Sequence, residues 1–194
     1  MLNSTLSASL AFLLLILSIG CSCKKVADSR WTDSEINYYI NRNASPQSVR
    51  AIETAFDSWA AATHFNFAFA GRNHAGLNKD GRNTVSFLTN WPDDLPFGQT
   101  AWCRCWFDRR GNIIECDIIL NQQLARFTTI ETGKTDSYYI EGVVAHEIGH
   151  MIGLGHCELF TSVMKPDSPP DESWFKGLID DETISEYREL YNLD

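Results

Sequence analysis

Residues 146–156 read H-E-I-G-H-M-I-G-L-G-H, which places three histidines and one glutamate close together. His146 and His150 are four residues apart, so on a helix they share one face, with Cβ atoms about 5–6 Å apart. Two imidazoles at that separation can bind one zinc ion. Glu147 follows the first histidine directly and points beside the metal rather than at it. That position suits a base acting on metal-bound water.

A third metal ligand has to come from beyond this helix. Glycine tolerates the left-handed conformation that ends a helix, so the chain can turn at Gly153 and bring His156 back to the metal. Three protein ligands leave the fourth position open for water, as in catalytic zinc sites, whereas structural sites close it. The chain has only 5 histidines, and three of them lie here. This concentration favours a zinc site over an accidental match.

The segment that carries the histidines is predicted to be a mostly buried helix. Apolar residues cover most of the circumference of a helix drawn over Tyr138–Ile152. Three prolines between residues 166 and 170 then exclude regular structure. Beyond them, Asp180 can cap a last helix. Its buried face is predicted to consist of Ile184, Tyr187 and Leu190.

The first half of the chain predicts a helix packed on a sheet. Glu35–Asn41 is rich in Ile and Tyr and reads as a strand. Ser45 is a good N-cap, and Pro46 suits the first position of a helix. One apolar stripe then recurs at helical spacing, formed by Val49, Ile52, Phe56 and Trp59. Residues 65–70 and 84–88 supply two more predicted strands.

Residues 99–120 are predicted to form a hairpin. Gln99–Phe107 and Ile113–Leu120 would be its strands, joined by a turn over the residues between them. A turn of suitable length places Cys105 opposite Cys116, close enough for a disulfide, although Cys103 is a rival partner. The chain is therefore expected to be a single α+β domain with a sheet, two large helices and a C-terminal helix.

The N-terminus is predicted to be an export signal. An unbroken apolar run over residues 10–17 is too short to span a membrane but suits the core of a signal peptide. The end of this segment resembles the lipobox of bacterial lipoproteins, in which Cys21 would carry lipid; the alternative is an ordinary exported cysteine. We therefore divide the chain into a signal peptide (1–20), a short tether or pro-segment (21–30) and a catalytic domain (31–194).

Composition narrows the range of functions. The chain has 194 residues, of which 44% are hydrophobic and 21% charged, as in an ordinary globular protein. Its formal net charge of -9 disfavours nucleic-acid binding, which needs clustered Lys and Arg. We expect a monomer that contacts a membrane only through a lipid attached to Cys21.

A methionine follows the histidines within Ser162–Pro166 (S-V-M-K-P). With the residues before it, this segment resembles the signature of the metzincin metallopeptidases, H-E-x-x-H-x-x-G-x-x-H followed by a Met-turn. The chain is most similar to the matrixins, or matrix metalloproteinases, in a small bacterial form. The resemblance implies a mixed twisted sheet with an antiparallel edge strand over residues 99–104. It also implies that Met164 lies beneath the metal and that a peptide substrate pairs with the edge strand.

The resemblance and the motif together predict a zinc-dependent endopeptidase acting on extracellular proteins, either secreted or anchored at the cell surface or outer membrane. His146, His150 and His156 would bind one catalytic zinc ion, and Glu147 would be the general base for a zinc-activated water. The alternative is a zinc-binding surface adhesin without peptidase activity.

Further metal sites and latency have less support in the sequence. Calcium at Asp80, Asp93 or Asp94 is a further hypothesis, set against the usual role of loop aspartates, which is to form turns. Only His64 and His74 remain for a second, structural zinc, which is fewer than the four ligands such a site needs. No pro-domain of the length found in mammalian matrixins fits before residue 31. A shorter latch, with Cys23 or Asp28 bound to the zinc, is a hypothesis motivated by position alone.

Overall fold

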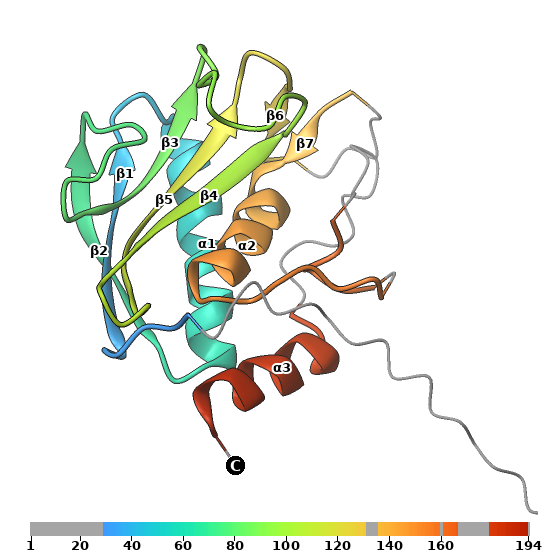
Figure 1. The fold of residues 1–194 in the computed structure, drawn as a ribbon. Helices are drawn as coiled ribbons and strands as arrows, with labels where there is room; N and C mark the ends of the chain where they lie inside the picture. The colour runs from blue at the N-terminus through green and yellow to red at the C-terminus, as the bar shows by residue number, and fades with distance from the viewer. Residues whose placement is uncertain (1–28, 131–135, 160, 167–178, 194) are drawn as a thin grey trace, which may run out of the picture.

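The computed structural model describes residues 29–130, 136–159, 161–166 and 179–193. Figure 1 shows a twisted sheet with two helices on one face and a third helix below them. The elements in chain order are β1 (Glu35–Asn41), α1 (Pro46–Ala62), β2 (Asn66–Asn73), β3 (Asn83–Leu88), β4 (Ala101–Phe107), β5 (Ile113–Asn121), β6 (Phe127–Thr128), β7 (Tyr138–Tyr139), α2 (Ile140–Met151) and α3 (Asp181–Tyr191).

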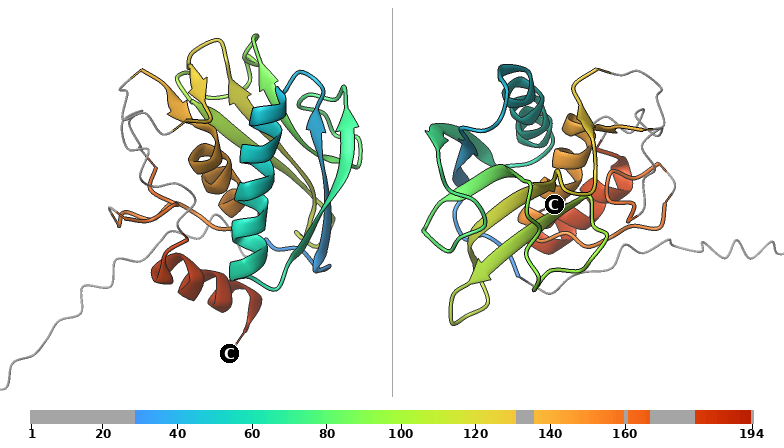
Figure 2. Two further views of the ribbon diagram at one scale, coloured as in Figure 1. Left: turned by 180° about the vertical axis from the view of Figure 1, so that it is seen from behind. Right: turned by 90° about the horizontal axis from the view of Figure 1, so that it is seen from above.

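The main sheet has five strands in the order β2-β1-β3-β5-β4. All neighbours pair in parallel except β4 and β5, which are antiparallel. β4 is therefore an outer strand, and its second edge has no strand partner among the described residues. Seen from behind, α1 and α2 lie side by side across one face of the sheet (Figure 2). The predicted α+β class with an antiparallel edge strand is confirmed.

The helix α1 forms where the sequence predicts it. The side chain of Ser45 accepts a hydrogen bond from the Ser48 backbone N–H, and Pro46 occupies the first turn. The apolar stripe of this helix, including Ile52, Phe56 and Trp59, is buried. Trp59 also donates from Nε1 to the Ala145 carbonyl at 2.8 Å. This bond fixes α1 against α2, the helix that carries the histidine motif.

Some predicted boundaries, and one predicted buried face, differ from the structure. The edge strand begins at Ala101 rather than Gln99. The ladder ends with the bond from the Asn121 N–H to the Thr100 carbonyl, and the Gln99 carbonyl accepts instead from the side chain of Asn121. The second helix begins at Ile140, since the two residues before it form β7 and pair with β6. In α3, Thr183 is fully buried, whereas Ile184 is only half-buried.

Of the two disulfide pairings that the sequence left open, the structure contains the pair across the β4 and β5 strands. Cys105 and Cys116 face each other in the β4–β5 ladder and form a disulfide, while Cys103 keeps a free thiol. Cys157 is also disulfide-bonded. Cys21 and Cys23, with the rest of the predicted signal peptide and tether up to residue 28, lie outside the described residues. No helix in the described part of the chain is long and apolar enough to cross a membrane.

Two carboxylates of β5 hold the loop that leads into β3. Glu115 accepts hydrogen bonds from the backbone N–H groups of Asp80 and Gly81. Asp117 accepts one from Asn78 at 2.8 Å and one from Thr84 at 2.9 Å. Desolvation by burial nevertheless raises the pKa of Asp117 to about 7, since it outweighs these two hydrogen bonds.

We predict that Asp117 makes the fold less stable as pH rises towards neutrality. Its folded pKa of about 7 lies above that of an unfolded aspartate, so the folded chain keeps a proton that the unfolded chain has already lost. Stability present at low pH is therefore lost as pH rises, by on the order of 2 kcal/mol between about pH 5 and about pH 7. Chemical denaturation at the two pH values should show this loss in the wild type and a smaller one in Asp117→Asn. Equal pH dependence in the two proteins would contradict the prediction.

Candidate metal centre

The three histidines of the motif converge at the C-terminal end of α2. Their ring centroids are 4.8 Å apart for His146 and His150, 5.3 Å for His146 and His156, and 4.7 Å for His150 and His156. The Nε2 atoms of His150 and His156 are 3.1 Å apart. Nitrogen atoms that each lie ~2.0–2.1 Å from one tetrahedral ion have comparable separations. The three imidazoles can therefore hold a metal ion, as the sequence predicts.

Backbone carbonyls orient two of these rings. Nδ1 of His146 lies 2.7 Å from the Val163 carbonyl oxygen, and Nδ1 of His150 lies 2.9 Å from that of Leu154. A carbonyl oxygen only accepts, so each Nδ1 carries the hydrogen and donates. Each Nε2 is then left with a lone pair, which is the form that binds a metal. The carbonyl partners could not be predicted, because a backbone carbonyl has no signature in the sequence.

The two helical imidazoles are held in the neutral state. Burial lowers the pKa of His146 to about 3, and the nearby His150 acts in the same direction. Burial likewise lowers the pKa of His150 to about 4. Neither ring needs to release a proton at neutral pH before it binds a cation. A set of three imidazole nitrogen donors suits zinc, so the residues present fit the metal that the motif predicts.

The turn that returns His156 depends on Gly153. This residue has φ +92°, a left-handed conformation in which a side chain is strained. Its N–H donates to the His150 carbonyl, and the Leu154 N–H donates to the Gly149 carbonyl, which closes the end of the helix. A Cβ at position 153 would also collide with the Ser29 carbonyl oxygen. The predicted turn at Gly153 is confirmed.

Met164 packs directly beneath α2. It is 1% exposed, and its sulfur lies so close to Gly149 that a Cβ there would overlap it. Met164 also accepts at its carbonyl from the Cys157 N–H at 2.8 Å, which joins this turn to the segment after His156. The sequence predicted Met164 below the metal, but the role of Gly149 appears only in the packing.

Asp180 connects this turn to the last helix. One carboxylate oxygen accepts from the Thr183 N–H and caps α3, as predicted. The other accepts from the Val163 N–H at 3.2 Å and from the Thr183 hydroxyl at 2.7 Å. Val163 is the residue whose carbonyl orients His146, so a single carboxylate links α3 to the candidate metal centre.

Glu147 belongs to α2, and its side chain lies between this helix and the edge strand β4. It is 6% exposed, and desolvation by burial raises its pKa to about 8. The backbone N–H of Cys103 in β4 hydrogen-bonds the carboxylate and acts in the opposite direction. A divalent cation beside it would also favour the ionised form. Sequence reasoning placed Glu147 beside the metal but missed its contact with β4.

The other residues considered for metal binding lie elsewhere. His64 packs among Phe65, Tyr187 and Tyr191 and contacts the Tyr187 hydroxyl, while His74 is exposed. Asp80 caps its own loop, and Asp94 pairs with Arg104. Among the described residues, the only other cluster of ligand-type side chains is Cys103, Cys105 and Cys116, two of which are joined by a disulfide. The proposed latch residues Cys23 and Asp28 lie outside the described residues.

Comparison with known proteins agrees with this geometry. Residues 30–192 match the sequence model of the family described as Matrixin. Metalloendoproteinase 1 of Glycine max is 37% identical over 60 residues, which cover 31% of this chain and 19% of that protein. The chain thus matches well under two thirds of that relative's length.

We predict that Gly149→Ala disturbs both the fold and the metal centre, because the added methyl group would displace Met164 or α2. Overpacking of this kind costs about 1–3 kcal/mol of unfolding free energy. Gly76→Ala is the matched control, since a Cβ there meets only Leu88 Cδ2 at 3.7 Å. Chemical denaturation and a zinc titration should show losses of stability and of zinc affinity in the first variant only. Equal behaviour of the two variants would refute the proposed role of Gly149.

Proposed function

Because the chain belongs to the matrixin family, whose members are zinc metallopeptidases, we propose that it is a zinc-dependent endopeptidase that cleaves extracellular proteins. The observation that carries the proposal is the convergence of three imidazoles beside a buried carboxylate. His146, His150 and His156 would hold the ion, and Glu147 would be the general base. Three protein ligands leave a position for water or substrate, which a structural site would not.

Bound zinc would supply Lewis-acid activation of a water molecule and of the scissile carbonyl. The protein's own part in the chemistry is proton transfer. The Glu147 carboxylate would take a proton from the attacking water and deliver it to the leaving amine nitrogen. Burial that raises the pKa of this carboxyl makes it a better base than an exposed glutamate. Its hydrogen bond from Cys103 keeps it next to the strand that would bind the peptide.

The outer edge of β4 is the proposed binding surface for the substrate backbone. Within the described part of the chain this strand pairs only with β5, so its other edge offers N–H and carbonyl groups to an extended peptide. Main-chain pairing does not depend on side-chain identity, so it positions many sequences equally well. Such pairing would place the scissile bond near Glu147, because Cys103 lies in the middle of β4.

We also propose that the chain is exported and acts as a monomer on protein or peptide substrates, without nucleic acid. The apolar run at residues 10–17 supports export, and the small residues before Cys21 support a lipid anchor at that cysteine. The division into a signal peptide (1–20), a short tether (21–30) and a peptidase domain (31–194) is part of the same proposal.

Glu147→Gln tests the reaction chemistry. We expect it to bind zinc in the same ratio as the wild type but to lose activity on casein or a labelled peptide by at least ~100-fold, because it cannot accept the proton. Glu141→Gln, at the start of the same helix, is the matched control and should retain activity. Metal analysis and kcat/KM together decide the outcome. Unchanged turnover of Glu147→Gln would refute its role as the general base, whereas a wild type that binds zinc but cleaves nothing would favour a zinc-binding adhesin.

Zinc removal tests the metal site independently of activity. Saturating zinc should stabilise the fold, by about 4 kcal/mol when its concentration is a thousand times the Kd. We therefore expect a chelator to lower the Tm of the wild type. His150→Ala should already have a low Tm and respond little to the chelator, whereas the exposed His74→Ala should respond as the wild type does. A Tm that ignores the chelator in all three proteins would rule out zinc at this site.

A further inference from the structure

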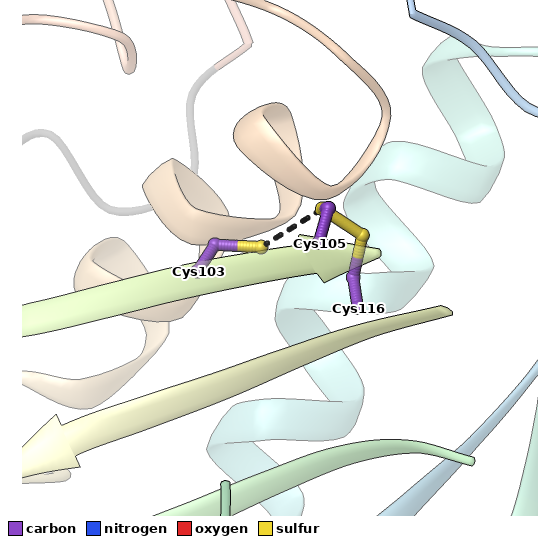
Figure 3. A group of neighbouring side chains, drawn as sticks. All are labelled: Cys103, Cys105 and Cys116. Atoms are coloured by element: carbon purple, nitrogen blue, oxygen red, sulfur yellow. Dashed lines mark hydrogen bonds between the residues drawn. A yellow bond between two sulfur atoms is a disulfide. The ribbon is translucent and has the colours of Figure 1, made fainter. Parts of the chain in front are cut away.

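Three cysteines gather on the face of the sheet that carries α2. Cys103 and Cys105 are two positions apart on β4 and so point to the same face, and Cys116 lies opposite Cys105 on β5. Their sulfur atoms all lie within 4.8 Å of one another. Figure 3 shows the Cys103 sulfur directed at the disulfide formed by the other two. The proposed peptidase chemistry uses none of these sulfur atoms.

The three sulfur atoms differ in chemical state. Cys105 and Cys116 are bonded to each other, whereas Cys103 is a thiol. The Cys103 sulfur lies 3.8 Å from that of Cys105. A disulfide sulfur has no hydrogen, so the Cys103 thiol must be the donor in this contact. Its sulfur is therefore adjacent to an atom that a thiolate can attack.

We propose that Cys103, Cys105 and Cys116 form a thiol–disulfide exchange site, in which the disulfide moves between two positions. The Cys103 thiol releases its proton to solvent, and the resulting thiolate forms a bond to the Cys105 sulfur. The bond between Cys105 and Cys116 breaks, and the Cys116 sulfur leaves as a thiolate that takes a proton from solvent. One thiol and one disulfide are present before and after, so the step needs neither oxidant nor reductant.

A nearby carbonyl can accept a hydrogen bond from the released Cys116 thiol. The Cys116 sulfur lies 3.6 Å from the Met151 carbonyl oxygen. In the disulfide this sulfur has no hydrogen to donate, but a Cys116 thiol would donate a weak hydrogen bond there. The same carbonyl accepts from Trp31 Nε1 at 2.8 Å, which holds it in place in both states. The exchanged state therefore gains an interaction that the resting state lacks.

Two features favour the Cys105–Cys116 disulfide over the exchanged one. Burial raises the pKa of the Cys103 thiol, and the charges of Glu147 and Asp117 act in the same direction, so the attacking thiolate is scarce at neutral pH. Residues two apart in a strand also have Cα atoms about 6.6 Å apart, near the upper end of the ~4.4–6.8 Å range for disulfides. The exchanged disulfide thus requires β4 to shorten around Arg104.

Exchange would alter the strand on which the proposed substrate binds. Shortening β4 around Arg104 moves the Cys103 N–H, which hydrogen-bonds Glu147. It also removes the covalent link that fixes this outer strand to β5. The exchanged isomer should therefore be the weaker peptidase. This consequence rests on the proposed function, whereas the exchange itself does not.

Trypsin can map the disulfide in the purified chain. Arg104 separates Cys103 from Cys105, and Arg109 and Arg110 separate Cys105 from Cys116, so each cysteine falls on its own peptide. Before treatment, alkylation followed by digestion without reduction should label Cys103 and link the peptides of Cys105 and Cys116. After incubation at about pH 9, where more thiolate is present, a Cys103–Cys105 link and label on Cys116 should appear. Label confined to Cys103 after this treatment would overturn the proposal.

Two variants fix the separate isomers. Cys116→Ser should form the Cys103–Cys105 disulfide, while the matched control Cys103→Ser should keep the original pair at both pH values. We expect kcat/KM on a short peptide to be at least about fivefold lower for Cys116→Ser, because the strand beside Glu147 is displaced. Two free thiols in Cys116→Ser would overturn the proposal, and equal kcat/KM would overturn its effect on the peptidase. If neither variant nor the wild type cleaves peptides, the proposed function fails while the mapping still decides the exchange.

Discussion

Two hydrogen bonds between imidazole rings and the backbone hold the candidate metal centre together. They run from Nδ1 of His146 to Val163 and from Nδ1 of His150 to Leu154. Both carbonyls belong to the segment that follows α2, turns at Gly153 and passes back beneath the helix. The direction of each Nε2 therefore depends on where that returning segment lies. The contact between Met164 and Gly149, which has no side chain, sets how closely that segment packs against α2.

Elements distant in sequence hold this unit in place. The N-terminal helix α1 fixes α2 through the bond from Trp59 to Ala145, deep in the core. The C-terminal helix α3 holds the returning segment through the carboxylate of Asp180. A short motif can specify the ligands, but nearly the whole chain is needed to position them. The match to the family model, over residues 30–192, likewise includes α1, α2 and α3.

Side-chain patterns predicted the elements and the candidate ligands, and backbone interactions account for most of what they missed. The Ser45 cap and the apolar stripe ending at Trp59 placed α1 correctly, because capping and periodicity are properties of local sequence. The histidine spacing and Gly153 located the candidate centre for the same reason. By contrast, the start of β4 at Ala101 and the bond from Cys103 to Glu147 involve N–H and carbonyl groups, which every residue has. Only the assembled fold decides which of these groups meet.

The outer edge of β4 also bears on self-association. An unpaired strand edge can add a strand from a second copy of the chain as readily as a peptide, and repeated addition leads to aggregates. Two features of this strand oppose that outcome. Arg104 places a charge in its centre, and the pairing register shifts between Trp106 and Phe107, which bends the end of the strand. The edge can thus accept a short extended segment yet is a poor template for long, flat pairing between identical molecules.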